Sequence, residues 1–430
     1  MTPFEDAPFT PFHRRVAISG AGGQFSDGYS LGIIAIALDL AKGPLGLTSW
    51  WAGAIGAASL FGLFLGSLVS GGLADRFGRR PVFTWGMLFF AVIAALQFTA
   101  GSAEQLFGWR FLTGVALGAD YVSCKAMLSE FAPTCRRGQL LSVMGIAWAA
   151  GYLCSFLAGY LVQENVHDAW RIVLLTSAVP AIATFLLRFG MPESAQWLVR
   201  KGRDDEAAAI VAKHIGSEVS LPVVAPLKSP EASEDAKRLF HAPLSRNLVV
   251  ACLFHTAQVV PYFALSTFLP SILAQLGVRD VYFGSVVYNV LMMIGAVAGW
   301  FVIDRLPRRT FLIQGFVVTA VLLTIMIVWR QAPTQITVTL FAVLGLVMSA
   351  VGILQFVYPP ELFPTELRAR GIGYETACSR IGSALSTFLL PVVVSTYGVY
   401  SALGACMAIS VLAAAICQIW APETLRKRLK

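Results

Sequence analysis

The sequence contains few charged residues. Asp, Glu, Lys and Arg together make up 13% of its 430 residues, about half the share that is usual in a soluble protein, whereas hydrophobic residues make up 57%. Apolar runs of about 20 residues recur along the chain, and each is long enough to span a bilayer. The composition therefore excludes an ordinary soluble protein and indicates a multi-pass protein that is embedded in a lipid bilayer.

Features of several other protein classes are also missing. Seven cysteines are scattered without a C-x-x-C pair or a ligand-like neighbour, which predicts neither a metal site nor a disulfide. No nucleophile and base form a recognisable motif, so we expect a protein that is not an enzyme and has no cofactor. Residues 1–15 are polar and proline-containing, without a small-residue cleavage site, so the first apolar run is predicted to be a membrane helix and not a signal peptide.

The net charge of +8 does not indicate nucleic-acid binding, because Lys and Arg fall mostly on alternate loops. Basic residues concentrate in cytoplasmic loops, so this pattern predicts that both termini are cytoplasmic and that the number of spans is even. We predict twelve spans, at residues 16–38, 51–73, 82–100, 106–128, 139–162, 170–190, 248–274, 283–303, 311–329, 334–357, 373–396 and 400–420.

Three sequence patterns occur twice at nearly the same spacing. The pattern at Asp75 returns 229 residues later at Asp304, that at Glu130 returns 231 residues later at Glu361, and that at Glu193 returns 230 residues later at Glu423. Such agreement indicates a duplicated unit. We therefore predict an all-α membrane fold of two pseudo-symmetric six-helix halves, residues 1–190 and 248–430, joined by a cytoplasmic linker with short helices at residues 191–247.

The stretch GGLADRFGRR, residues 71–80, links two predicted spans. It resembles the signature that joins the second and third helices in the major facilitator superfamily, whose members are transporters. The resemblance implies alternating access and a cytoplasmic gate made by charged residues that recur in both halves and tie them together when the carrier opens outward. We assign to this gate Gly71, Asp75, Arg76, Gly78, Arg79, Arg80, Glu130, Arg137, Glu193, Asp304, Arg308, Arg309, Glu361, Arg368 and Glu423.

Two further stretches resemble one branch of that superfamily. PESAQWL at residues 192–198 and APETLRKRL at residues 421–429 are similar, with several mismatches, to the sugar-porter patterns P-E-S-P-R-W-L and P-E-T-K-G. These stretches do not by themselves assign a sugar as the substrate.

Ionisable residues within spans are costly and therefore mark candidate functional sites. Asp27 lies in span 1, and Arg110 begins the span-4 stretch RFLTGVALG, which resembles the R-x-x-x-G-x-x-x-G motif of the superfamily. In similar proton-coupled members a span-1 carboxylate faces this arginine. We expect such a pair to take part in proton coupling, with a static ion pair as the alternative. Asp120, in a stretch that resembles metabolite and phosphate symporters, is a further proton or substrate candidate, and Lys125 lies nearer the cytoplasm.

Arg380 in span 11 is the main substrate candidate. The stretch GIGYETACSRIGSALSTFLLP resembles span 11 of organic-anion and aromatic-acid carriers, and a guanidinium binds a carboxylate bidentately. The alternative is that Arg380 pairs with Glu375 or Asp27 and meets no substrate. The remaining candidates for the pocket are Gln24, Tyr29, His255, Gln258, Tyr262, Tyr288, Asn289, Gln355, Tyr358 and Glu375.

These features predict a monomeric secondary transporter in a bacterial inner membrane that imports a small organic anion, an aromatic acid or another carboxylate, with protons as the coupling ion. A sugar or polyol symporter and a phosphate symporter remain alternatives. A drug-exporting antiporter is less favoured, because residues 140–162 contain three glycines but no proline. A channel would not need two matched gate networks, and a transporter-like receptor would be separated from a carrier by transport in proteoliposomes.

Overall fold

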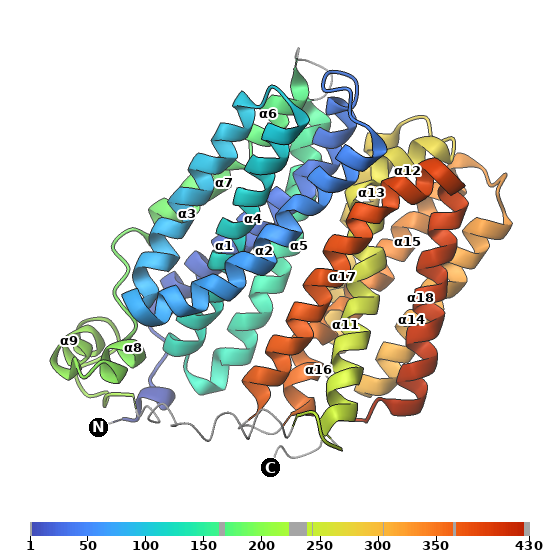
Figure 1. Cartoon of the computed structure of the whole chain (residues 1–430). Helices are drawn as coiled ribbons and strands as arrows, with labels where there is room; N and C mark the ends of the chain where they lie inside the picture. The colour runs from blue at the N-terminus through green and yellow to red at the C-terminus, as the bar shows by residue number, and fades with distance from the viewer. Residues whose placement is uncertain are drawn as a thin grey trace.

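The computed structural model describes residues 2–162, 168–222, 239–242, 244–303, 305–363 and 367–424, and these form an almost entirely helical bundle (Figure 1). Helices match each of the twelve predicted spans. The N-terminal half contains α1 (Pro11–Ala41), α2 (Ser49–Phe77), α3 (Arg79–Leu96), α4 (Ala103–Phe131), α5 (Thr134–Val162), α6 (Ala169–Leu175) and α7 (Ala178–Arg188). The C-terminal half contains α11 (Leu244–Thr267), α12 (Leu269–Gln275), α13 (Val281–Val302), α14 (Arg308–Val328), α15 (Thr334–Gly352), α16 (Leu354–Leu362), α17 (Arg368–Tyr397) and α18 (Val399–Trp420).

Three predicted spans are each divided into two helices. Span 6 consists of α6 and α7, span 7 of α11 and α12, and span 10 of α15 and α16. The break in span 7 lies at Phe268, just before Leu269 and Pro270. Proline has no backbone N–H to donate to the preceding turn, so the helix cannot continue undisturbed through this position.

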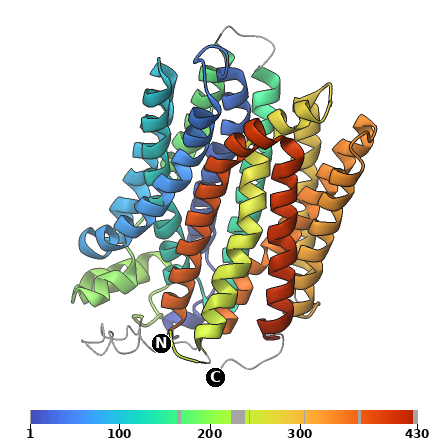
Figure 2. The same cartoon turned by 45° about the vertical axis from the view of Figure 1, so that its right-hand side comes forward.

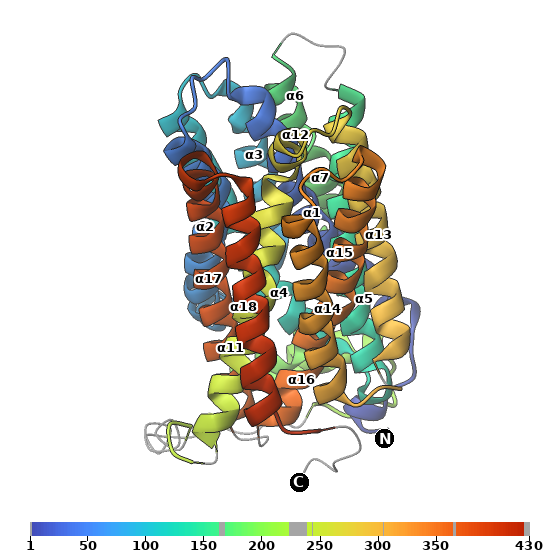
Figure 3. The same cartoon turned by 90° about the vertical axis from the view of Figure 1, so that its right-hand side faces the viewer.

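The two halves stand side by side, with the N-terminal half in blue to green and the C-terminal half in yellow to red (Figures 1 and 2). They meet where α2 packs against α17, where α5 packs against α13, and where α1 packs against α11 and α12. With the C-terminal half turned toward the viewer, α11, α14, α17 and α18 lie in front of the N-terminal helices (Figure 3). This arrangement leaves the central helices of both halves facing one another.

Helix α1 begins and helix α18 ends at the same end of the bundle, as the predicted topology requires (Figure 1). The short helices α8 (Ala195–Arg200) and α9 (Asp204–His214) pack together at this end and fall within the predicted linker. We call it the cytoplasmic end, because it carries the basic loops. The boundaries of the halves at residues 190 and 248 stay a prediction.

Glycines bring helix backbones into direct contact in both halves. A Cβ added at Gly114 of α4 would overlap the carbonyl of Ser59 on α2, and one added at Gly299 of α13 would overlap the carbonyl of Ala350 on α15. Small residues allow such close approach between membrane helices, where van der Waals packing drives association. The span-4 glycine motif therefore holds α4 against α2, and a similar contact is built in the second half.

Ten helical segments in the described part of the chain are long and apolar enough to cross a membrane, and α1 and α4 are not among them. These two helices are long, at 31 and 29 residues, but they carry Asp27, Arg110, Asp120 and Lys125. They pack against each other and against α5, and α2, α3, α6 and α7 cover them further. Because neighbouring helices enclose them, their polar side chains face the protein interior and not lipid.

Candidate functional site

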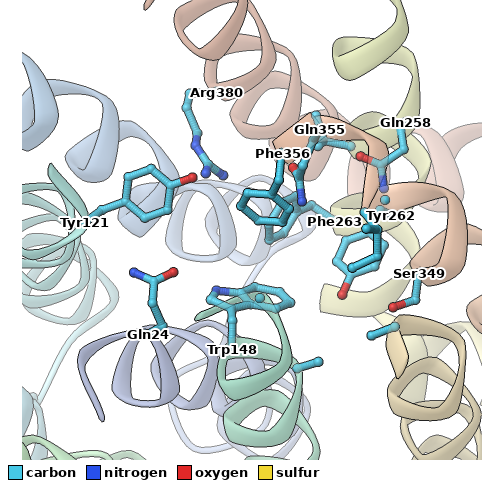
Figure 4. Close-up of a pocket in the computed structure, with 16 residues that line it drawn as sticks. Gln24, Tyr121, Trp148, Gln258, Tyr262, Phe263, Ser349, Gln355, Phe356 and Arg380 are labelled. Carbon is cyan, nitrogen blue, oxygen red and sulfur yellow. The ribbon is translucent and has the colours of Figure 1, made fainter. Parts of the chain in front are cut away.

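A cavity lies between the two halves (Figure 4). Its volume is about 80 Å³. Helices α1, α4 and α5 line it from one half, and α11, α13, α15, α16 and α17 from the other. Five predicted pocket residues lie on its wall, namely Gln24, Gln258, Tyr262, Gln355 and Arg380.

One side of the cavity is cationic. The guanidinium carbon of Arg380 lies 5.3 Å from the ring centroid of Tyr121. The ammonium of Lys125 donates a hydrogen bond to the Tyr121 hydroxyl at 2.6 Å and lies 3.9 Å from the same ring centroid. Figure 4 shows Arg380, Tyr121 and Gln24 together on this side. Among the described residues that line the cavity, none is an Asp or a Glu.

Arg380 is therefore not paired with Glu375 or Asp27, which was the alternative expected from the sequence. Within the described part of the chain, no carboxylate forms an ion pair with its guanidinium, and its buried Nε has no hydrogen-bond partner. Glu375 is bound to His255, and Asp27 accepts a hydrogen bond from Gln24. The cation next to the cavity is stabilised by the face of Tyr121, which the sequence analysis did not select although it directly follows Asp120.

Aromatic side chains from both halves form another wall. Trp148 of α5 packs against Tyr262 and Phe263 of α11, with ring centroids 6.1 and 6.2 Å apart. Phe356 of α16 also lines the cavity, and its ring lies 5.4 Å from the Lys125 ammonium. The sequence analysis missed Trp148, because an aromatic residue in an apolar helix gives no sign of which way it faces.

Asp27 lies just behind the cavity wall, with 1% of its surface exposed. One carboxylate oxygen accepts a hydrogen bond from Gln24 Nε2 at 3.2 Å, and the other has no partner among the described residues. Since Gln24 itself lines the cavity, Asp27 is one side chain away from a bound molecule. The charges of Asp120, Arg188 and Arg380 all act on it.

The expected contact between Asp27 and Arg110 is not formed. Arg110 is fully buried and donates to the backbone oxygen of Ser30 at 3.1 Å and to its hydroxyl at 3.4 Å. Asp27 and Ser30 are three residues apart on α1, which displaces their side chains by about 4.5 Å along the helix axis. Arg110 therefore binds neutral oxygens nearly one turn away from the carboxylate.

Asp120 has a different arginine as its partner, and the sequence analysis missed it. Arg188, at the end of α7, forms a buried two-point ion pair with Asp120. Its guanidinium also donates to the backbone oxygens of Ser19 at 3.2 Å and Phe83 at 2.7 Å. The pair joins α1, α3, α4 and α7 within one half. Arg188 was overlooked because it stands in the last turn of span 6, next to the linker.

Several predicted pocket residues face the interior of their own half and do not line the cavity. Tyr29 donates to Thr176 at 2.9 Å, Asn289 to the backbone oxygen of Ser285 at 2.8 Å, and Tyr358 to that of Pro422 at 2.6 Å. Tyr288 packs against Gly345, and His255 pairs with Glu375. A polar residue on a cavity-lining helix can face several neighbours, and its position in the sequence does not reveal which one.

At the cytoplasmic end of the N-terminal half, Glu193 accepts hydrogen bonds from three backbone N–H groups. They belong to Arg79 at 2.9 Å, Arg80 at 3.1 Å and Ser194 at 2.9 Å. Glu130 completes this network: it pairs with Arg79 at 3.3 Å and accepts a hydrogen bond from the Ser194 hydroxyl. The carboxylate of Glu193 thus caps the positive N-terminal end of α3.

The C-terminal half contains the same network. Glu423 accepts from the N–H groups of Arg308 at 2.9 Å, Arg309 at 3.1 Å and Thr424 at 3.0 Å, and so caps α14. Glu361 pairs with Arg308 at 3.5 Å and accepts from the Thr424 hydroxyl. Each network therefore binds parts of its own half. The expected role of tying the halves together is not seen between the described residues.

Gly78 and Arg76 differ in how the structure uses them. Gly78 has a φ of +106° between α2 and α3, a conformation that favours glycine. Arg76 is exposed, and its guanidinium lies 5.3 Å from the ring centroid of Phe77. Five predicted gate positions have side chains outside the described part of the structure: Gly71, Asp75, Arg137, Asp304 and Arg368.

A polar contact at the opposite end joins the two halves. Asp39 of α1 accepts hydrogen bonds from Ser271 of α12 and from Tyr282 of α13, each at 3.0 Å. Lys42 reaches Asp39 at 3.0 Å and Ser271 at 2.5 Å. We refer to these four residues as the outer clasp.

Comparisons with known proteins agree with the fold. Residues 16–430 match the family model described as "Sugar (and other) transporter". The inner membrane metabolite transport protein YgcS of Escherichia coli is 37% identical over 98% of this chain and 94% of its own length. The niacin transporter NiaP of Acinetobacter baylyi is 28% identical over 88% and 86%.

Among solved structures, a partially occluded inward-open form of the xylose transporter XylE from E. coli superimposes with a TM-score of 0.80 at 19% identity, over 98% of this chain and all of that one. That likeness concerns the fold alone. The family match extends over both halves, the linker and every cavity-lining helix. The chain is thus a multi-pass membrane protein that belongs to the sugar (and other) transporter family of the major facilitator superfamily.

Proposed function

We propose that the protein imports a small organic anion together with protons by alternating access in a bacterial inner membrane. The substrate class and the proton coupling are the parts of this proposal that go beyond membership of a transporter family. The observation that carries it is the guanidinium of Arg380, which lies at the cavity without a carboxylate partner in the described structure.

Charge supports an anionic substrate. Arg380 and Lys125 place two cations around Tyr121, and the described cavity wall contributes no acid to offset them. An ionised side chain inside a membrane protein is costly unless it is paired during part of the cycle. A substrate carboxylate would supply that pairing, and the planar guanidinium could bind both of its oxygens.

Shape supports an aromatic or similarly flat acid. The rings of Trp148, Tyr262 and Phe263 pack together at one side of the cavity, and aromatic pairs favour offset or edge-to-face contact with a further ring. The relative from A. baylyi is named as a transporter of niacin, which is an aromatic carboxylic acid. A ring against this wall with its carboxylate toward Arg380 would use both features of the cavity.

Asp27 is the group that we assign to proton coupling. Burial and the negative charge of Asp120 favour protonation of Asp27, the charge of Arg188 opposes it, and with the cavity empty the positive charge of Arg380 opposes it as well. A bound anion neutralises that charge and so favours protonation of Asp27. The two binding events therefore assist each other, which is the thermodynamic requirement for symport. Gln24, which contacts Asp27 and lines the cavity, links the two sites. Roles for Arg110 and Asp120 in coupling remain proposals.

A sugar or polyol is the second candidate. Three amide side chains, those of Gln24, Gln258 and Gln355, line the same cavity beside Trp148 and can bind hydroxyl groups. The description of the family and the xylose transporter among the structural neighbours also fit this possibility. On this alternative, Arg380 would be a structural cation that contributes little to substrate binding.

A proteoliposome uptake screen separates the two candidates. Purified protein is tested with benzoate, nicotinate, an aliphatic monocarboxylate, xylose, glucose and phosphate, each with and without an inward proton gradient. We expect accumulation of at least one carboxylate, driven by the gradient. Accumulation of a sugar or of phosphate, with no transport of any acid, would reject the organic-anion proposal.

A further inference from the structure

His255 and Glu375 form a buried pair that the cavity does not use. His255 Nδ1 and Glu375 Oε1 are hydrogen-bonded between α11 and α17, and the two residues are 4% and 1% exposed. The hydroxyl of Thr376 donates to the other oxygen of Glu375 at 3.1 Å. His255 Nε2 is buried and has no partner among the described residues.

The pair changes charge when it gains or loses one proton. With one shared proton it is neutral overall, whether that proton sits on the ring or on the carboxyl group. Without this proton it carries one negative charge. A buried negative charge is costly unless a positive charge compensates for it. The pair can therefore release its proton only when a cation nearby is free to offset it.

The neighbouring charges supply such a cation. Arg380 lies five residues beyond Glu375 on α17, an axial rise of about 7.5 Å. The charges of Lys125, Arg380 and Glu375 all act on Tyr121. The pair of His255 and Glu375 therefore lies near the cationic side of the cavity. Cys252 also interacts with Glu375 and with Cys378.

The helices packed against α11 and α17 bring few other charges. Helices α12, α15 and α18 contain no Asp, Glu, Lys, Arg or His, and α2 has charged residues only in its last turn. Glu361 of α16 is bound to Arg308, and the titratable groups Tyr358 and Cys417 lie toward that same end. Helix α1 contributes Asp27 near the cavity, with His13, Arg14, Arg15 and Asp39 toward its two ends. Arg246 of α11 donates to the backbone oxygens of Ile419 and Trp420, so among the described side chains of these helices Arg380 is the cation that we assign to offset the pair.

We propose that His255 and Glu375 form a second proton-binding site, in the C-terminal half, that fills when an anion occupies Arg380 and empties when the anion leaves. This inference rests on the proposed function. A proton from water binds the ring nitrogen or the carboxylate oxygen, and no other bond forms or breaks. An anion on Arg380 removes the compensation for the deprotonated pair, so the pair takes up a proton. Asp27 responds to the same cation from the other half.

Histidine resonances report on this site directly, because the chain has only five histidines. Full-length protein with isotope-labelled histidine is titrated from pH 5 to pH 9 without substrate, and His255 is assigned from its loss in His255→Gln. We expect the His255 signal of the wild type to report the proton that the ring shares with Glu375. In Glu375→Gln the signal should no longer follow the same curve, because the carboxylate that shares the proton is gone.

The link to Arg380 is tested in the same spectra. In Arg380→Gln the pair should hold its proton about tenfold more tightly, because the offsetting cation is lost. Saturating benzoate, used as the probe, should have the same effect in the wild type. His214 on α9 is the internal control. The pKa of its ring is lowered by burial and by Lys213 and Arg15, far from the cavity, and should not respond.

The outcomes separate this inference from the proposed function. A His255 signal that stays constant from pH 5 to pH 9, or a proton affinity of the pair that does not change in Arg380→Gln, overturns the second proton site even if acids are transported. A titration that depends on Arg380, together with a screen in which no acid binds, supports the proton site and rejects the proposed substrate class.

Discussion

The two cytoplasmic networks match contact by contact, whereas the ionisable residues within the membrane do not. Glu193 caps α3 as Glu423 caps α14, and Glu130 pairs with Arg79 as Glu361 pairs with Arg308. Deeper in the membrane, the N-terminal half holds Asp27, Arg110 and the pair of Asp120 with Arg188, while the C-terminal half holds Arg380 and the pair of His255 with Glu375.

This difference distinguishes the contacts that build the fold from the charges that we assign to transport. Contacts that repeat in both halves position helices, and they can be read as part of a shared fold. Charges that occur in only one half are the ones to which we assign the chemistry particular to this transporter. Because α1 of one half and α17 of the other face one cavity, the carboxylate that we propose for proton coupling and the arginine that we propose for anion binding come from different halves. Movement of the halves can therefore change the interaction between them.

The largest effect is expected at a repeated backbone contact. Gly114→Ala places a methyl group against the carbonyl of Ser59, and overpacking of this kind costs about 1–3 kcal/mol or more. We expect a clear fall in folded yield and thermal stability. Gly108→Ala on the same helix is the matched control, because a Cβ there meets no atom within 4 Å. Equal stability of the two variants would show that α2 and α4 are not held by this contact.

Asp27→Asn should remove coupling while leaving the protein folded. Asn has the size of Asp and can keep the hydrogen bond to Gln24, but it does not ionise. Accumulation driven by a proton gradient should be lost, while exchange of internal for external substrate persists. Accumulation is measured as uptake, and exchange is measured as counterflow, in the same proteoliposomes. Normal accumulation by this variant would remove Asp27 from the coupling role.

The repeated caps should give matched, moderate effects. Glu193→Gln and Glu423→Gln each replace a charged cap by a neutral one, which weakens a helix N-terminus by about 0.5–2 kcal/mol. Turnover should slow several-fold in both, with little change in substrate affinity. Glu206→Gln, at an exposed pair with Arg203 on α9, serves as the control. A large loss of affinity in only one of the two variants would break the equivalence of the halves.

The smallest effect is expected at the outer clasp. Asp39 links α1 to α12 and α13, but it is partly exposed, and such contacts contribute about 0–1 kcal/mol. Asp39→Asn should shift the balance slightly toward forms that are open at this end. Labelling of a cysteine introduced at Ser49, which lines a nearby surface pocket, should become faster by a few-fold. Unchanged labelling would mean that the clasp does not hold the halves together.

Much of the architecture could be predicted from the sequence. The spacing of apolar runs predicted the spans, and the repeats at Glu193 and Glu423 marked groups that turned out to be equivalent. The two most polar spans, which carry Asp27 and Arg110, were also predicted from their apolar runs, although the composition of α1 and α4 does not place them among the helices that are apolar enough to cross a membrane. Periodicity and charge distribution suffice for this level of description.

The partners of buried side chains could not be predicted. Arg110 was expected to contact Asp27, yet it binds Ser30, and Asp120 binds Arg188 instead. Which face of a helix meets which neighbour depends on rotations of a few tens of degrees, which the order of residues does not specify. For the same reason His255 and Glu375 were assigned to the pocket, although they pair with each other inside one half.

The central claim is that Arg380 binds the carboxylate of the substrate. Calorimetry compares an acid identified by the uptake screen with its neutral amide, on wild-type protein, Arg380→Lys and Arg380→Ala. Arg330→Ala, at an exposed position between α14 and α15, is the control.

The wild type should strongly prefer the acid. Arg380→Lys should lose about 1.5–3 kcal/mol of binding free energy, as expected for a hydrogen bond to a charged group, and Arg380→Ala should no longer distinguish acid from amide. A sugar or polyol that binds the wild type, and whose affinity in Arg380→Ala stays within about twofold, would contradict the claim and favour the sugar alternative.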